Sequence, residues 1–159
     1  MNKFNFISIG ILFFIVTIFV GCKNSQNDEI IYFGIAQKPQ TLDPRFSSDA
    51  ASERLSSLIY TPLIFFNEDF TIGSDLVKIK KISSKRFSFT LTKNPPNFHN
   101  GAILGIDDII STIRHLMNSS ASPYSNELKI VSAVNKISEN IFEILLKKSD
   151  HNFLSKLSF

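Results

Sequence analysis

Few residues in this 159-residue chain have the type and spacing that catalysis or metal binding requires. The one acidic pair, Asp107–Asp108, is adjacent, and adjacent side chains on a helix do not face each other, so the two carboxylates cannot easily share one substrate atom. They are better explained as negative charges in the first turn of a helix. The histidines are scattered, without the i, i+4 spacing of a helical zinc site: His99, His115 and His151.

Other catalytic signatures are also missing from the sequence. It has no nucleophile elbow, no serine with an evident His/Asp pair and no phosphate-binding glycine loop. His99 precedes Asn100-Gly101, which favours a turn residue over a metal ligand. The sequence therefore predicts no catalytic residue, no metal site and no cofactor.

Two tyrosines are candidates for binding instead of catalysis. Tyr60 lies between Ile59 and Thr61-Pro62, a setting that favours the core. Tyr124 follows Ser122-Pro123 in a predicted loop. An aromatic side chain on a loop is either exposed by chance or placed to stack on a ligand, and the sequence leaves both alternatives open.

The only cysteine, Cys22, directly follows an apolar run from Phe4 to Val20. One positive residue, Lys3, then a short apolar core and a small residue are typical of a bacterial export signal. A bilayer span needs about 20 apolar residues, so the run is slightly short for a stable anchor. Val20-Gly21-Cys22 resembles the lipobox of bacterial lipoproteins.

That resemblance implies that residues 1–21 are a signal peptide and that Cys22 carries the lipid anchor. An uncleaved anchor and an ordinary secretory signal are the alternatives. Lipidation would consume the only thiol, which would exclude disulfides and cysteine-ligated metals from the mature chain. Residues 22–29 are polar and are predicted to be a flexible tether.

The formal net charge is +3, and part of it lies in one cluster between Lys78 and Arg86. Ile79 and Ile82 interrupt this cluster, and a Ser-Ser pair falls within it. Basic residues without interleaved aromatic side chains favour a solvated strand edge or loop over a nucleic-acid surface. We therefore expect no nucleic-acid partner.

The first elements that would position these residues lie between residues 30 and 66. The apolar run Ile30–Ala36 predicts a strand buried on both faces. A helix is expected from about Asp49, capped by Ser48 or Asp49, and Thr61-Pro62 ends it. Leu63–Phe66 suggests a short strand. The spacing of three residues gives the helix one apolar face: Leu55, Leu58 and Ile59.

The later elements have clearer patterns. Phe87–Lys93 alternates between apolar and hydroxyl residues, which predicts a half-buried strand. Ile130–Val134 and Ile141–Lys147 are further strand candidates. Phe153–Phe159 is apolar and resembles the start of another packed element. A helix over residues 106–117, with Gly105 as N-cap, would bury one stripe: Ile109, Ile110, Ile113, Leu116 and Met117.

Several segments together resemble the family 5 extracellular solute-binding proteins, the oligopeptide, dipeptide and nickel receptors of ABC importers. Leu42-Asp43-Pro44 matches the family's Leu-Asp-Pro, and Ile59–Leu63 its Ile-Tyr-Glu-Gly-Leu. Phe89–Lys93 resembles its Phe-x-Leu-Arg strand. The most specific match is Phe98-His99-Asn100-Gly101 followed by Asp108-Ile109-Ile110. Asn100 replaces the usual aspartate, and the chain has no tryptophan.

This resemblance implies an α/β fold: over residues 30–159, the N-terminal part of a two-lobed periplasmic-binding-protein-like (class II) fold, incomplete in this chain. It implies a peptide or other small solute as ligand, ABC permease subunits as partners, a membrane contact through the lipid anchor and an extracytoplasmic location. It also implies ligand-binding positions near the cleft: Ser48, Asp49, Ala50 and Tyr124.

Because only the first portion of the family is matched, we expect a truncated form with impaired ligand binding, whether from a truncated gene, an assembly fragment or a split receptor. Such a fragment should expose the apolar Phe153–Phe159 end and aggregate. The alternative is a small structural or adhesive surface lipoprotein that reuses the fold and unfolds cooperatively. A hydrolase is the least supported reading.

Overall fold

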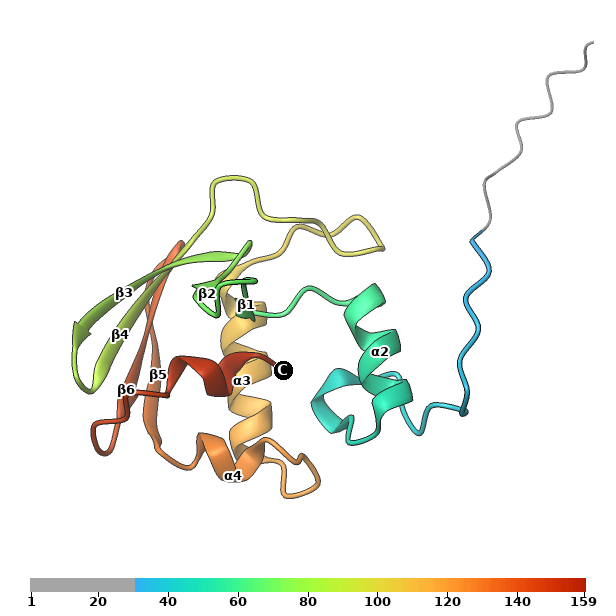
Figure 1. Ribbon diagram of the computed structural model, residues 1–159. Coiled ribbons are helices and arrows are strands. Elements are labelled where there is room, and N and C mark those ends of the chain that lie inside the picture. Colours follow the sequence, from blue (N-terminus) through green and yellow to red (C-terminus); the bar gives the residue numbers. More distant parts are fainter. Residues whose placement is uncertain (1–30) are drawn as a thin grey trace, which may run out of the picture. The chain divides into compact units, whose positions relative to one another are not determined.

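The computed structural model describes residues 31–159. The predicted signal peptide, the predicted anchor Cys22 and the tether of residues 22–29 lie outside the described residues. Ile35–Phe159 form one compact unit, which combines helices and strands as the sequence predicted (Figure 1). Residues 31–159 contain no helix with both the length and the apolar character needed to cross a bilayer.

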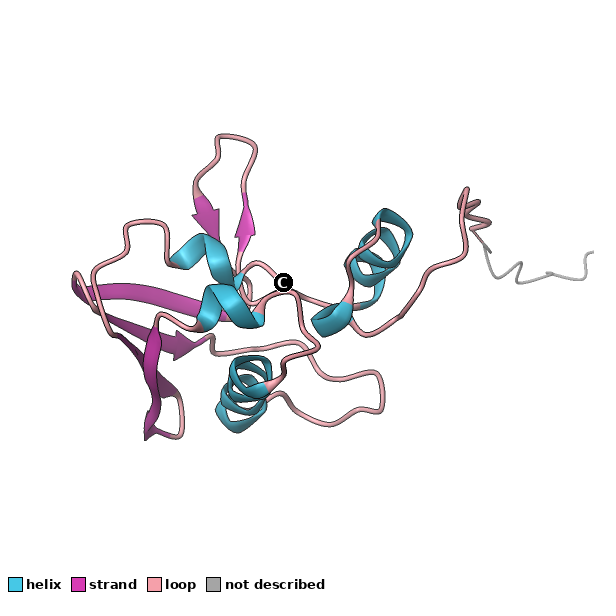
Figure 2. Ribbon diagram, turned by 90° about the horizontal axis from the view of Figure 1, so that it is seen from below, coloured by secondary structure: helices cyan, strands magenta, loops and turns pink. Residues whose placement is uncertain are grey.

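A four-stranded antiparallel sheet is the framework of this unit. Its strands are β3 (Val77–Ser83), β4 (Arg86–Leu91), β5 (Val131–Ser138) and β6 (Ile141–Leu146), in the spatial order β3-β4-β6-β5. Two hairpins, β3–β4 and β5–β6, therefore join through β4 and β6. The helices lie on one side of this sheet (Figure 2).

The core lies between the sheet and helix α3 (Ile106–Asn118). The rings of Phe89 on β4 and Phe142 on β6 stack with centroids 4.8 Å apart, and both residues are fully buried. Removing such a ring typically costs about 3–5 kcal/mol. The strand and helix predicted from periodicity are confirmed, and α3 buries most of the predicted stripe: Ile109, Ile110, Ile113 and Leu116.

Helix α3 begins as the sequence predicted. Gly105 is the N-cap, and its backbone N–H donates to the Asp108 carboxylate at 2.8 Å. Asp107 and Asp108 both lie in the first turn, where their charges suit the helix dipole.

The C-terminal segment packs into the core, so the expectation that Phe153–Phe159 is exposed is wrong. Phe153 and Leu157 are fully buried around the short 3₁₀ helix η2 (Leu154–Leu157). The Phe153 ring lies 5.1 Å from that of Phe87 on β4. These side chains cover one end of the sheet, which the sequence pattern did not reveal.

A second, two-stranded sheet pairs β1 (Phe65–Phe66) with β2 (Ile72–Gly73). The connecting turn holds Phe70 at φ 62°, with 86% of its surface exposed. A positive φ is unfavourable for a residue with a Cβ atom. Strand β2 was not predicted, because two residues carry no periodicity.

The predicted strand over Ile30–Ala36 is wrong for the described part of that run. Residues 31–36 form no strand, and Ile31 and Tyr32 are 90% and 89% exposed. A strand needs a neighbour to satisfy its backbone N–H and C=O groups, and no strand of residues 35–159 pairs with this run.

Helix α2 (Ala50–Ile59) begins where the sequence predicted, with Asp49 as its N-cap. Its predicted apolar face is wrong, because the helix buries Ser52 and Ser56 while Leu58 is 67% exposed. Ser52 Oγ accepts hydrogen bonds from the backbone N–H groups of Gln40 at 3.0 Å and Thr41 at 3.1 Å. These bonds orient the hydroxyl side of the helix inward.

The remaining short elements connect these parts. The 3₁₀ helix η1 (Pro44–Phe46) precedes α2, and α4 (Ser125–Leu128) lies between α3 and β5. The basic cluster falls on β3, an edge strand whose lysines are exposed. This confirms the predicted solvated strand edge, and lysines on an edge also oppose unwanted strand pairing.

Candidate functional site

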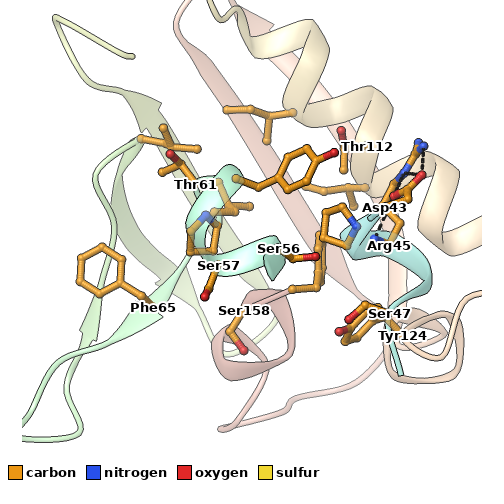
Figure 3. A pocket seen from close by; sticks show the side chains of 18 of the residues that line it. Asp43, Arg45, Ser47, Ser56, Ser57, Thr61, Phe65, Thr112, Tyr124 and Ser158 are labelled. Carbon is orange, nitrogen blue, oxygen red and sulfur yellow. Dashed lines mark hydrogen bonds and ion pairs between the residues drawn. The ribbon is translucent and has the colours of Figure 1, made fainter. Parts of the chain in front are cut away.

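A pocket of about 870 Å³ lies between α2 and α3 (Figure 3). Its wall on the α3 side is mainly apolar and includes Ile109 and Ile113, which are buried in the core. Leu63, Leu76 and Leu104 extend this wall. Ligand pockets in proteins are commonly concave and mostly apolar, with a few polar groups.

The wall on the α2 side is polar. Ser56 is only 7% exposed, and its Oγ has no hydrogen-bond partner among residues 31–159. The side chain lines the pocket, with the hydroxyl directed into it (Figure 3). An unsatisfied buried hydroxyl costs about 1–3 kcal/mol, so this group is poised to bond to a ligand.

One ion pair lies at the pocket, between Arg45 and Asp43. Arg45 Nε and Nη2 donate to the two carboxylate oxygens of Asp43 at 2.9 Å and 2.6 Å. This hydrogen bonding lowers the pKa of the Asp43 carboxyl and raises the pKa of the Arg45 guanidinium. Since the pair neutralises itself, it leaves the charge balance of the pocket to other residues.

Two further carboxylates line the pocket, those of Glu53 on α2 and Asp108 on α3. Asp108 accepts the Gly105 N–H, and neither carboxylate forms an ion pair with any lysine, arginine or histidine of residues 31–159. The pocket lining therefore has an excess of negative charge.

Tyr124 closes one side of the pocket. Burial, and then the nearby Glu53 charge, raise the pKa of its phenol, while a hydrogen bond with Ser47 lowers it. Its ring packs against that of Phe159, with centroids 5.5 Å apart. Ser122 ties this loop to η1, because its Oγ donates to the Arg45 carbonyl at 2.7 Å.

The structure separates the four predicted ligand-binding residues. Tyr124 lines the pocket, whereas Ser48, Asp49 and Ala50 do not. The Asp49 carboxylate accepts the N–H groups of Ala51 at 3.1 Å and Ser52 at 2.9 Å, so it caps α2. Ser48 and Ala50 are exposed beside it.

Sequence reasoning missed several pocket residues. Tyr60, expected in the core, is 46% exposed and lines the pocket. Ser56 was missed because the leucines of α2 suggested the opposite inner face. The available signal was the pair Ser52 and Ser56, four residues apart and so on one side of the helix.

Residues 31–159 contain no group of three or more His, Cys, Asp or Glu side chains arranged to hold a metal ion. His99 lies exposed in the turn that Gly101 makes at φ 84°.

Comparisons with known proteins match this chain by structure only. No family model matches, and no curated protein matches. Among solved structures, the periplasmic murein tripeptide binding protein MppA, in its unliganded open form, matches with a TM-score of 0.70 and 17% identity over 78% of this chain and 28% of that chain.

Two other structures match similarly. NikZ from Campylobacter jejuni, in complex with Ni(L-His), has a TM-score of 0.67 and 20% identity over 77% of this chain and 25% of NikZ. The oligopeptide-binding protein AppA from Bacillus subtilis, in complex with a nonapeptide, has a TM-score of 0.65 and 23% identity over 72% of this chain and 23% of AppA.

The match thus spans 28% or less of each of these three proteins. The neighbours are the kind of protein that the sequence motifs resemble. At these identities the comparisons establish the fold, so residues 31–159 have the mixed helix-and-sheet architecture of the matched portion of periplasmic peptide- and nickel-binding proteins.

Proposed function

We propose that this chain is the N-terminal portion of an extracytoplasmic solute-binding protein of family 5, which delivers a peptide or other small solute to an ABC permease. One observation carries this proposal. Segments far apart in the sequence that resemble the family meet at the pocket, where they contribute lining residues: Asp43, Pro44, Tyr60, Leu63, Phe98, Asp108, Ile109 and Tyr124.

This function is binding without chemical conversion of the ligand. Solute-binding proteins of the two-lobed kind close by a hinge motion, and closure depends on ligand contacts that differ between the open and closed states. Residues 31–159 supply one wall of such a site. We propose that this portion alone binds peptides weakly, as expected for a truncated gene product, an assembly fragment or one part of a split receptor.

Calorimetric titration with a pool of short peptides tests the weak binding. We expect heats that saturate only at millimolar peptide, because the contacts that a second lobe would add are missing. Saturation in the micromolar range would show that residues 31–159 already hold a complete site, which would contradict the proposal of impaired binding.

The location is part of the same proposal. A lipid on Cys22 would keep the chain at an extracytoplasmic membrane surface, with residues 22–29 as the tether and residues 1–21 removed. Cells fed labelled palmitate should transfer the label to the chain. The variant Cys22→Ser should remain unlabelled, and label on that variant would exclude this cysteine as the anchor.

A structural or adhesive surface lipoprotein is the second candidate. The burial of Phe153 and Leu157 favours it, because the described unit then has a closed core. This candidate predicts cooperative thermal unfolding and no heat with any solute. Solute binding that is lost on substitution of a pocket residue would argue against it.

A further inference from the structure

The inner face of α2 is the starting observation. A helix that packs only for stability buries its apolar side chains, yet α2 directs Ser52 and Ser56 inward and leaves Leu58 exposed. Ser52 is satisfied by the preceding loop. Ser56 is not, and it faces the pocket.

The surroundings of Ser56 are acidic. Glu53 lies three residues before it on α2, and side chains at this spacing are neighbours on the helix surface. Asp108 lines the same pocket from α3. Of the four charged lining residues, Arg45 and Asp43 neutralise each other, which leaves two carboxylates without a cation among residues 31–159.

The opposite wall sets the rest of the ligand. Ile109, Ile113, Leu63 and Leu76 are buried apolar residues, and they present a surface that suits an aliphatic group. The volume of about 870 Å³ is within the range of small-molecule sites, about 300–1,000 Å³. A ligand that satisfies both walls has a positive end and a short apolar body.

We propose that this pocket binds a primary ammonium group carried on a short aliphatic body. The ammonium donates to the Ser56 hydroxyl and faces the Glu53 and Asp108 carboxylates, while the aliphatic group contacts the wall formed by α3. This inference rests on the proposed function, because it names the chemistry of the solute. Both the amino terminus of a peptide with an aliphatic first residue and a free aliphatic amine carry this chemistry.

The test uses the full chain in lipid nanodiscs, with empty nanodiscs as the blank because amines partition into lipid. Calorimetric titrations compare leucinamide, isopentylamine and N-acetyl-leucinamide at a slightly acid pH, where both amines are protonated. A charge-assisted hydrogen bond is worth about 1.5–3 kcal/mol, so acetylation should weaken binding by roughly tenfold or more. Equal affinity for leucinamide and its acetylated form, or no binding of either amine, would overturn the inference.

Variants of α2 sharpen the test. Glu53→Gln and Ser56→Ala should each weaken amine binding by about fivefold or more, since each removes a polar group from the ammonium. The matched control Glu68→Gln, an exposed carboxylate on the β1–β2 turn and outside the pocket, should bind like the unchanged chain. Ser56→Ala should leave the unfolding temperature the same or raise it, because it deletes an unsatisfied hydroxyl. Unchanged affinity in both pocket variants would place the amine elsewhere.

Peptides distinguish this inference from the proposed function. Leu-Gly-Gly and its acetylated form are titrated in the same way. If both peptides bind equally while the amines fail, the solute-binding function stands and the ammonium site is wrong. If the amines bind and neither peptide does, the ammonium site stands and the peptide class is wrong. Isopentylamine binding as well as leucinamide would show that the pocket reads the amine without the peptide group.

Discussion

Arg86 on β4 grips Glu143 on β6 across the centre of the sheet: its Nε donates to Oε2 at 2.8 Å and its Nη2 to Oε1 at 3.0 Å. Glu143 is 8% exposed although it points away from the core side, where its neighbours Phe142 and Ile144 are buried. The carboxylate is thus covered by the guanidinium and by the strands around it.

Replacing Arg86 should therefore cost more than an ordinary surface substitution. Arg86→Ala leaves a nearly buried carboxylate without its two donors, and the half-exposed arginine limits the loss by letting water in. We expect a decrease of about 1–2 kcal/mol in the free energy of unfolding, measured by urea titration. Lys81→Ala, an exposed change on neighbouring β3, is the control and should stay near the unchanged value.

The cap of α2 should make its stability depend on pH. Hydrogen bonds from the Ser52 hydroxyl, and then from backbone N–H groups, lower the pKa of Asp49 below its ordinary 3.8. A lowered folded-state pKa stabilises the folded state above the unfolded value, and this contribution is lost as the pH falls through the folded pKa.

Asp49→Ala should accordingly lower the unfolding temperature at neutral pH, and the gap from the unchanged chain should shrink in solutions more acid than the ordinary carboxyl pKa. Asp49→Asn is the matched control, because asparagine is also a good N-cap, and it should retain most of the stability. A gap that stays constant with pH would show that the Asp49 charge does not contribute.

The turn of the β1–β2 hairpin should be improvable. Phe70 adopts φ 62°, which costs a residue with a Cβ atom about 1–2 kcal/mol. Phe70→Gly removes this cost, partly offset by the greater freedom of glycine in the unfolded chain, and should raise the unfolding temperature. Phe70→Ala keeps the Cβ atom and should give no such rise, so thermal unfolding of the two variants separates backbone strain from loss of the ring.

The loop that carries Tyr124 should loosen without Ser122. Ser122 is 3% exposed, donates to the Arg45 carbonyl and accepts the Tyr124 N–H at 3.3 Å. Ser122→Ala should decrease the free energy of unfolding by about 1–2 kcal/mol and weaken amine binding, because Tyr124 would lose its fixed position. Ser132→Ala, an exposed serine on β5, should change neither measurement.

The parts of the fold that sequence predicted well are those whose burial follows from local spacing. Helix α3 has an acidic first turn and an isoleucine stripe, and β4 alternates, so each pattern already contains the buried face. The short elements β1, β2 and η2 have too few residues for a period, and only their partners define them.

Helix α2 shows why the site was harder to predict. Leu55, Leu58 and Ile59 have a spacing typical of a core face, yet the inward direction is set by hydrogen bonds from residues 40 and 41 to Ser52. Tyr124 was found from the family resemblance, whereas Ser56 and Glu53 depend on how α2 is rotated. That rotation is a tertiary property, which no helical periodicity encodes.

The order of strands in the sheet has a consequence for how the chain reaches its folded state. Each hairpin can form alone, but the central pairing of β4 with β6 joins residues as far apart as Arg86 and Glu143, which are 57 positions apart. Pairings of such separation slow folding, because loop-closure entropy is lost before the contact is gained. As the chain emerges residue by residue, Phe89 must stay uncovered until Phe142 arrives, so the interval between the two is when this protein would most need a chaperone.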